Sequence, residues 1–152
     1  MADFELAIPV VLRNEGGYVN DPNDAGGETN FGISKRSYPN VDIKNLTVEE
    51  ASAIYKRDFW KFDGINDQAV ATKLFDSYVN NGRTAIRIAQ EIVVAPEDGE
   101  YGPHTEALIN NVSPTVFLMQ FRSSLAQHYQ NIVNANPQDM KFLKGWLRRA
   151  AQ

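Results

Sequence analysis

Residues 13–34 read R-N-E-G-G-Y-V-N-D-P-N-D-A-G-G-E-T-N-F-G-I-S, and this stretch decides how the chain folds around its candidate site. The segment before it, residues 3–14, carries apolar residues at helical spacing, which predicts a helix that Pro9 kinks or shifts at its start. Two glycines follow Glu15, and glycines end helices readily because they adopt the left-handed conformation at little cost. Glu15 is therefore predicted at the C-terminal end of the first helix.

The next residues, 20–27, are rich in Asn, Asp, Pro and Gly, which favour turns. Two tight turns here would direct Asp24 back toward Glu15, and residues 29–33 would then form a short strand or a pocket wall. The helix dipole favours cations at a helix C-terminus, so a carboxyl group there suits the task of carrying and donating a proton. An acid at a helix end facing a polar hairpin is an arrangement suited to one wall of a sugar-binding cleft.

The stretch E-G-G-Y-V-N-D-P-N-D-A-G-G-E-T-N-F-G-I-S resembles the signature of glycoside hydrolase family 108, whose members are phage endolysins and related bacterial muramidases that cut peptidoglycan. The resemblance implies a lysozyme-like α+β fold and a catalytic glutamate at Glu15. The later segments similar to the family are I-Y-K-R-D-F-W at 54–60, D-S-Y-V-N-N-G at 76–82, D-G-E-Y-G-P-H-T at 98–105 and G-W-L-R-R at 145–149. The last two resemble a peptidoglycan-binding part of the family.

A second resemblance concerns spacing, because some phage lysozymes carry a Glu, eight residues, an Asp, five residues and a Thr. Here eight residues separate Glu15 from Asp24, but Thr29 follows after four and Asn30 occupies the Thr position. Glycoside hydrolysis uses a proton donor and a second carboxylate, so we expect Glu15 to be the acid, with Asp24 and Thr29 assisting. An Asx turn is an equal alternative role for Asp24. The other candidates for the second carboxylate are Asp21 and Glu28.

Aromatic rings and side-chain amides are the expected sugar-contacting groups, and the candidates are Tyr18, Asn30, Tyr78, Asn80 and Asn81. Phe31 and Trp60 are also aromatic, but the core is the expected place for them. The two adjacent asparagines precede a glycine at a helix end, so the alternative role for either is a helix cap.

The composition excludes several classes of protein. Fifteen Lys and Arg against nineteen Asp and Glu give a net charge of −4, which argues against a general nucleic-acid-binding protein. The chain has no cysteine and no zinc-ligand spacing, so we expect neither a metal nor a cofactor. For the same reason a wall peptidase, which needs zinc or a Cys-His pair, is disfavoured.

The location of the protein is also an expectation from sequence. The N-terminus carries acidic residues where a signal peptide needs basic ones, and no stretch approaches the ~20 apolar residues of a membrane span. We therefore expect a monomer made in the bacterial cytoplasm that reaches the wall with the help of a holin-type or other component.

Helix signals dominate the rest of the chain. Thr47 and Glu50 form a capping-box pattern that predicts a helix to about residue 60. Further helices are expected over 67–82, 84–94 and 105–110, then from Ser113-Pro114 and from Asn136-Pro137. The predicted fold is mainly α, a lysozyme-like α+β bundle with one small β-hairpin region after the first helix.

Two regions are expected: a catalytic region at 1–82 and a helical C-terminal region at 83–152. No long Pro, Gly or Ser linker separates them, so one compact unit is predicted. The basic residues near the end are expected on a solvated helix face or against anionic wall polymers or lipid: Lys141, Lys144, Arg148 and Arg149.

The predicted function is hydrolysis of the β-1,4 bond between N-acetylmuramic acid and N-acetylglucosamine in peptidoglycan. One alternative is a lytic transglycosylase acting on the same bond with a single acid. Another is a non-catalytic wall-binding protein in which residues 83–152 hold the glycan. The intact E-G-G-Y sequence speaks against that second alternative.

Overall fold

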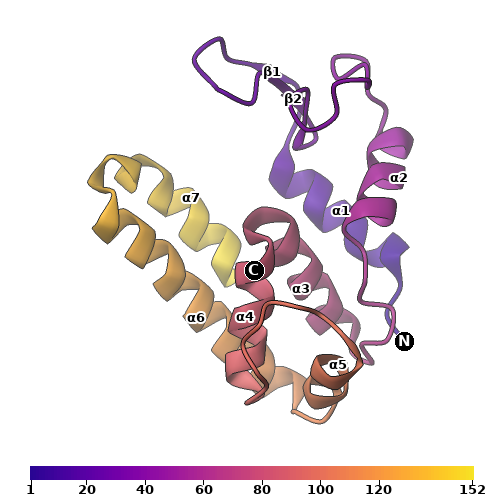
Figure 1. Ribbon diagram of the computed structural model, residues 1–152, viewed down its shortest axis with the longest axis vertical. Helices are drawn as coiled ribbons and strands as arrows, with labels where there is room; N and C mark the ends of the chain where they lie inside the picture. Colours follow the sequence, from indigo (N-terminus) through magenta and orange to yellow (C-terminus); the bar gives the residue numbers. More distant parts are fainter. The chain divides into compact units, whose positions relative to one another are not determined.

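The structure is a computed structural model that describes residues 1–152 and divides into two compact units (Figure 1). We call residues 3–60 the N-terminal unit, and residues 1–2 together with 61–152 the helical unit. The elements of the N-terminal unit are α1 (Phe4–Glu15), β1 (Val19–Asn20), β2 (Glu28–Asn30), β3 (Ile33–Ser34) and α2 (Val48–Asp58).

Helix α1 ends at Glu15, as predicted. Asp3 caps its start by accepting a hydrogen bond from the Glu5 N–H at 2.9 Å, and the apolar face of the helix is buried. Pro9 does not shift the start of the helix, which runs unbroken from Phe4 to Glu15 with Pro9 inside it. Pro9 removes only one intrahelical donor, and buried residues on both sides of it hold the helix in place.

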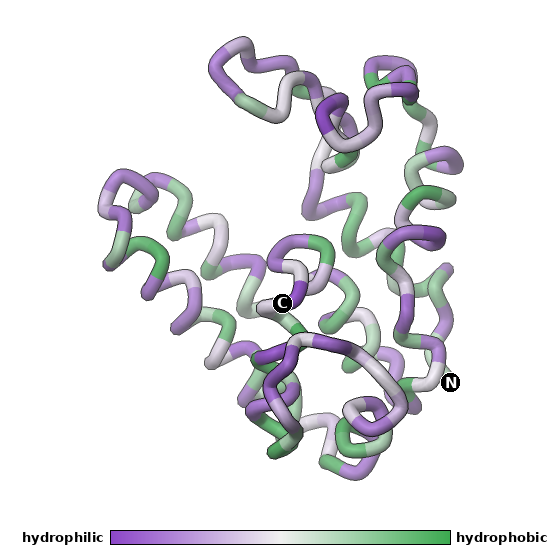
Figure 2. Tube along the Cα trace, in the orientation of Figure 1, coloured by the Kyte–Doolittle hydropathy of each residue, from purple (hydrophilic) through white to green (hydrophobic).

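The predicted β-hairpin region after the first helix is confirmed and contains three antiparallel strands in the order β1-β2-β3. Val19 pairs with Thr29, and Asn30 pairs with Ile33. Phe31 and Gly32 therefore form a two-residue turn, and both have positive φ values, 51° and 77°. Positive φ at both central residues defines a type I′ turn, which matches the twist of the strands. The loop between β1 and β2 is mostly hydrophilic (Figure 2).

The capping box that predicted α2 is present. The Thr47 hydroxyl accepts a hydrogen bond from the Glu50 N–H at 3.1 Å, and the Glu50 carboxylate accepts one from the Thr47 N–H at 3.2 Å. The helix buries Ala51, Ile54 and Tyr55 at helical spacing. Its buried face therefore carries one polar atom, the Tyr55 hydroxyl.

The helical unit contains α3 (Gln68–Asn81), α4 (Arg83–Ile92), α5 (Pro103–Asn110), α6 (Pro114–Ala135), the 3₁₀ turn η1 (Pro137–Asp139) and α7 (Met140–Ala151). The expected helices are confirmed, although the Ser113 side chain makes no capping bond. Helices α6 and α7 run antiparallel to each other (Figure 1). None of the helices combines the length and apolar character needed to cross a bilayer.

An ionic cluster fastens the end of α7 to α3. The buried Lys73 ammonium donates to the carbonyl oxygens of Arg149 and Ala150 at 2.9 and 2.8 Å. Asp76 binds Arg149 through two hydrogen bonds of 2.9 and 3.1 Å, with both side chains largely buried. Burial lowers the pKa of Lys73 to about 8. The expectation of a solvated basic face was therefore wrong for Arg149, whose charge is used inside the helical unit.

The boundary between the compact units lies between residues 60 and 61, earlier than the division expected at 82/83. Helix α3 is the reason for this difference. Its sides are buried by packing against α4 and α6, so it belongs structurally with the helices that come after it in the chain.

Candidate active site

The Glu15 carboxyl group lies against the turn that joins β2 and β3. A Cβ atom built on Gly32 would lie 2.6 Å from Glu15 Oε2 and 2.9 Å from its carboxyl carbon. Side chains do not approach each other so closely, so only glycine fits at position 32 while Glu15 keeps this rotamer. Glu15 is half-buried, and Gly16 ends its helix with the N–H donating to the Leu12 carbonyl at 3.1 Å.

Tyr55 brings a hydroxyl group to the same place. Its side chain is 2% exposed, and its hydroxyl donates to the Phe31 carbonyl at 2.7 Å. The hydroxyl oxygen also lies 2.7 Å from the position that a Cβ on Gly32 would take. The Glu15 carboxyl and the Tyr55 hydroxyl therefore border the same methyl-sized space. Sequence reasoning missed this role for Tyr55, although a hydroxyl on the buried face of a helix usually has a specific partner.

Tyr18, just before β1, and Glu28, the first residue of β2, form a pair. The Tyr18 hydroxyl donates to Glu28 Oε2 at 2.7 Å, and this hydrogen bond to a carboxylate raises the pKa of Tyr18. One oxygen of Glu28 is thus occupied, which weakens its candidacy as the second carboxylate.

The two aspartates of the β1–β2 loop fix turns. Asp21 Oδ1 accepts a hydrogen bond from the Asn23 N–H at 2.9 Å, and Asp24 Oδ1 accepts one from the Gly26 N–H at 2.8 Å. Both are Asx turns, in which the side chain orders its own backbone two residues on. Asp24 is exposed, and this geometry favours the structural role that was its alternative interpretation.

Thr29 and Asn30 lie on β2, the central strand. Thr29 pairs with Val19 on one side and Ser34 on the other, and it is half-buried. Asn30 is 7% exposed, and its amide donates to the Ile43 carbonyl at 3.1 Å. The amide of Asn30 is thus directed into the fold, which favours a structural role over contact with a sugar.

The two adjacent asparagines belong to the helical unit and hold α3 against α6. The Asn80 and Asn81 amides donate to the Tyr129 hydroxyl at 2.6 and 3.0 Å. The Asn81 amide also donates to the Ser77 carbonyl at 3.3 Å, which is the contact at the helix end that was its alternative role. These bonds favour a structural role over contact with a sugar for both asparagines.

Tyr78, on α3, already has partners for its hydroxyl and for its ring. The Lys61 ammonium donates to the Tyr78 hydroxyl at 2.9 Å and lies 4.4 Å from the centre of the ring. The ring of Phe62 lies 6.1 Å away in an edge-to-face arrangement. A sugar that stacks on Tyr78 would therefore have to displace the lysine from the ring face.

A buried glutamine organises the D-G-E-Y-G-P-H-T segment. The Gln90 amide nitrogen donates to Asp98 Oδ1 at 2.8 Å, to the Glu100 carbonyl at 3.0 Å and to the Thr105 hydroxyl at 3.2 Å. Its oxygen accepts from the Gly99 N–H at 2.9 Å. This motif therefore has a structural explanation in the loop before α5.

In the helical unit, a second glutamate packs against a glycine. The Glu106 carboxylate packs directly on Gly64 and accepts a hydrogen bond from the Tyr101 hydroxyl at 2.8 Å. Burial, followed by this hydrogen bond, raises the pKa of Tyr101. Asn110 fixes the same loop from α5 by donating to the Gly64 carbonyl at 2.8 Å and accepting from the Asn66 N–H at 2.9 Å.

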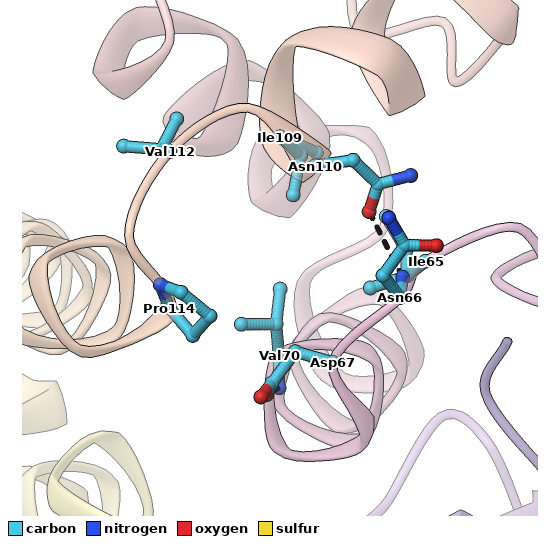
Figure 3. Close-up of a pocket in the computed structure, with 8 residues that line it drawn as sticks. All are labelled: Ile65, Asn66, Asp67, Val70, Ile109, Asn110, Val112 and Pro114. Carbon is cyan, nitrogen blue, oxygen red and sulfur yellow. Dashed lines mark hydrogen bonds between the residues drawn. The ribbon is translucent and has the colours of Figure 1, made fainter.

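Each unit contains a hollow that Glu15 does not line. Figure 3 shows a cavity of about 30 Å³ beside Asn66 and Asn110, which has room for water but not for a sugar ring. A groove of about 590 Å³ lies between α1 and α2, lined by apolar residues such as Ile8, Leu12 and Val48. The residues predicted to act on substrate line neither hollow.

Comparison with known proteins places the chain among relatives. A family model described as Glycosyl hydrolase 108 matches residues 8–82, and one described as Predicted Peptidoglycan domain matches residues 84–151. The structure is similar to that of Brucella abortus SagA, with 26% sequence identity and a TM-score of 0.79, over 97% of this chain and 89% of that chain. No curated protein matches the chain. The two family models meet close to the expected division at 82/83, whereas the compact units meet at 60/61.

Proposed function

Because residues 8–82 belong to the glycosyl hydrolase 108 family, the chain is a glycoside hydrolase that acts on peptidoglycan, and we propose that Glu15 is its proton donor. The bond cleaved is the β-1,4 linkage between N-acetylmuramic acid and N-acetylglucosamine. Glu15 protonates the leaving oxygen of this linkage as the bond breaks.

One observation carries the proposal: the Glu15 carboxyl is held in a defined place. It ends α1, is half-buried and lies in contact with the turn at Gly32. A proton donor must keep its orientation, because general acid catalysis depends on geometry before it depends on proton affinity. The contact with a rigid type I′ turn supplies this constraint for Glu15.

The test is digestion of purified peptidoglycan by the wild type and by Glu15→Gln, with mass analysis of the products. The neutral amide keeps the size of the side chain but cannot donate the acid proton, so activity should fall at least about 100-fold. The wild type should release reducing muramic-acid ends. Equal activity of the two proteins would remove Glu15 from the mechanism, and retained wall binding without cleavage by either would favour a binding protein.

The second candidate function is a lytic transglycosylase, which uses one acid and releases a 1,6-anhydro sugar. The contacts of the other carboxylates in the N-terminal unit are consistent with a single-acid mechanism. Asp21 and Asp24 fix turns, and Glu28 accepts a hydrogen bond from Tyr18. A two-carboxylate mechanism needs one of these groups to act on the substrate. Anhydro ends in the wild-type digest would establish this candidate in place of hydrolysis.

Asp24→Asn separates the two roles of Asp24. The amide oxygen of Asn still accepts the Gly26 N–H, so the turn is kept while the negative charge is lost. Although the turn favours a structural role for Asp24, we propose that Asp24, with Thr29, also assists Glu15, so Asp24→Asn should lower kcat at least about 100-fold. Unchanged kcat in Asp24→Asn, together with loss of stability in Asp24→Ala, would restrict Asp24 to the turn.

The biological role we propose is lysis of a bacterial host by a phage or prophage, or remodelling of the wall during release of particles or proteins. The protein acts as a monomer and reaches the wall with a separate permeabilising component. Expression in bacteria should therefore lyse the culture only when a holin-type protein is produced as well. Lysis without such a partner, or a dimer in size-exclusion chromatography, would contradict this part of the proposal.

A further inference from the structure

We infer that Phe31, Gly32 and Tyr55 form a seat that sets the orientation of the Glu15 carboxyl group, and that Tyr55 is a positioning residue for the reaction. We call these three residues the Glu15 seat. The inference rests on the proposed role of Glu15 as proton donor. In this inference the position of the Glu15 carboxyl group depends on the Tyr55 hydroxyl group and on the absence of a Cβ atom at Gly32.

The hydroxyl of Tyr55 has a fixed direction. Its single proton is donated to the Phe31 carbonyl at 2.7 Å, so only oxygen lone pairs are left to face other neighbours. The Glu15 carboxyl lies across the same small space at Gly32. The seat therefore places the Tyr55 hydroxyl oxygen and a backbone position without a Cβ atom beside the Glu15 carboxyl group.

The turn under the carboxyl group is held by the same hydroxyl. Phe31 has a φ of 51°, a left-handed conformation that is uncommon for residues other than Gly, Asn and Asp. The hydrogen bond from Tyr55 fixes the Phe31 carbonyl, which stabilises this conformation. Gly32 follows with a φ of 77° and has no Cβ that would displace Glu15.

The seat is also held in place by the burial of Tyr55 on α2. Tyr55 is 2% exposed and belongs to the buried face of α2, where its ring lies 5.5 Å from that of Phe59. A functional group held on a helix with a locked rotamer keeps its position better than one on a loop. Displacements of about 1 Å in such supports lower rates by as much as about 100-fold.

The first test compares two tyrosine variants of the whole protein. Tyr55→Phe removes the hydroxyl beside Glu15, and Tyr38→Phe removes a hydroxyl that donates to Asp58 at 2.7 Å elsewhere in the same unit. On a soluble peptidoglycan oligomer, Tyr55→Phe should lower kcat about 10- to 100-fold with KM changed less than about two-fold. Tyr38→Phe should leave both constants unchanged.

The second test compares two glycines. Gly32 and Gly27 have φ values of 77° and 72°, but only at Gly32 does an added Cβ meet Glu15 and Tyr55, whereas at Gly27 it meets nothing within 4 Å. Both alanine variants carry similar backbone strain. Gly32→Ala should therefore lower kcat at least about 10-fold more than Gly27→Ala does.

The outcomes separate this inference from the proposed function. If the wild type cleaves the glycan and Glu15→Gln does not, yet Tyr55→Phe matches Tyr38→Phe and Gly32→Ala matches Gly27→Ala, the seat is overturned while the acid stands. If Tyr55→Phe fails to fold, the comparison of kcat between Gly32→Ala and Gly27→Ala alone tests the seat. If Glu15→Gln is fully active, the proposed function has failed, and the seat fails with it.

Discussion

At the scale of a single residue, Val94 holds a backbone conformation that its own side chain disfavours. It follows α4 with a φ of 58°, and its side chain is 89% exposed. The turn closes when the Ala95 N–H donates to the Gln90 carbonyl at 2.9 Å, so Val94 occupies the left-handed position where helices usually carry glycine. A β-branched residue at this position is strained.

Val94→Gly should therefore stabilise the protein by about 1 kcal/mol, because the relief of strain exceeds the added flexibility of the unfolded chain. No packing is lost, since the side chain is in solvent. The measurement is the urea midpoint of unfolding. Val116→Gly is the matched control: Val116 is 39% exposed within α6, where glycine should destabilise by about 0.5–1 kcal/mol. A midpoint that falls in both variants would contradict the assignment of strain to Val94.

Single residues also mark where sequence reasoning ends. Glu15 was placed correctly at a helix end, because the apolar periodicity and the two glycines are local signals. The space at Gly32 that Glu15 and Tyr55 both border joins three segments that only tertiary packing brings together. No spacing rule connects these positions, so the support of the candidate acid could not be predicted.

At the scale of elements, the ionic cluster between α3 and α7 makes a prediction about stability. Asp76 and Arg149 form a largely buried pair, and removing one partner of such a pair leaves a charge without compensation. Asp76→Asn should destabilise the helical unit by about 3 kcal/mol. The measurement is urea unfolding followed by Trp146 fluorescence in a Trp60→Phe background.

The control for that experiment is an exposed pair in the same unit. Arg83 and Glu100 lie 2.6 Å apart with 55% and 69% of their side chains exposed. Exposed pairs contribute little, so Glu100→Gln should change stability by less than about 1 kcal/mol. Equal effects of Asp76→Asn and Glu100→Gln would mean that the cluster does not fasten α7.

Lys73 gives the same cluster a pH dependence. Burial lowers its pKa from 10.5 to about 8, so between these values the unfolded chain binds a proton here that the folded chain does not. The free energy of unfolding should therefore rise with pH across this window. Below pH 8 the folded protein bears the full cost of burying the charged Lys73 ammonium. Lys73→Met should flatten this rise in the urea midpoint. The comparison ends below pH 10, where the raised pKa of Tyr101 begins to act in the opposite direction.

Elements with local signals were predicted together with their ends, whereas the β-hairpin region was predicted without its strand pairing or its second turn. The capping box at Thr47 and the stop at Gly82 depend on neighbouring residues, and both are where the sequence placed them. The three-stranded sheet needed the Phe31–Gly32 turn, and Phe is not a residue that type I′ turns usually carry. The stability of that turn depends on its glycine and on the distant Tyr55, which no local pattern connects to it.

At the scale of the whole molecule, each compact unit contains one of the two tryptophans. Trp60 lies in the N-terminal unit with its ring 5.6 Å from that of Phe4, and Trp146 lies in the helical unit, stacked 5.4 Å from Tyr129. The unfolding of each unit can thus be followed on its own. The sequence did not reveal the boundary at 60/61, because no composition shift or flexible linker marks it.

The junction of α3 and α4 also determines how readily the protein deamidates during storage. Asn81 precedes Gly82. In flexible Asn-Gly segments the glycine nitrogen attacks the side-chain carbonyl carbon of asparagine and expels ammonia, and water then opens the resulting succinimide to aspartate or isoaspartate. Here the attacking Gly82 nitrogen donates to the Tyr78 carbonyl at 2.8 Å, and the Asn81 amide is held by Tyr129. Deamidation at this site therefore requires local opening of the helix end. The rate at which deamidated protein accumulates during storage would therefore report how often the C-terminal end of α3 unfolds locally.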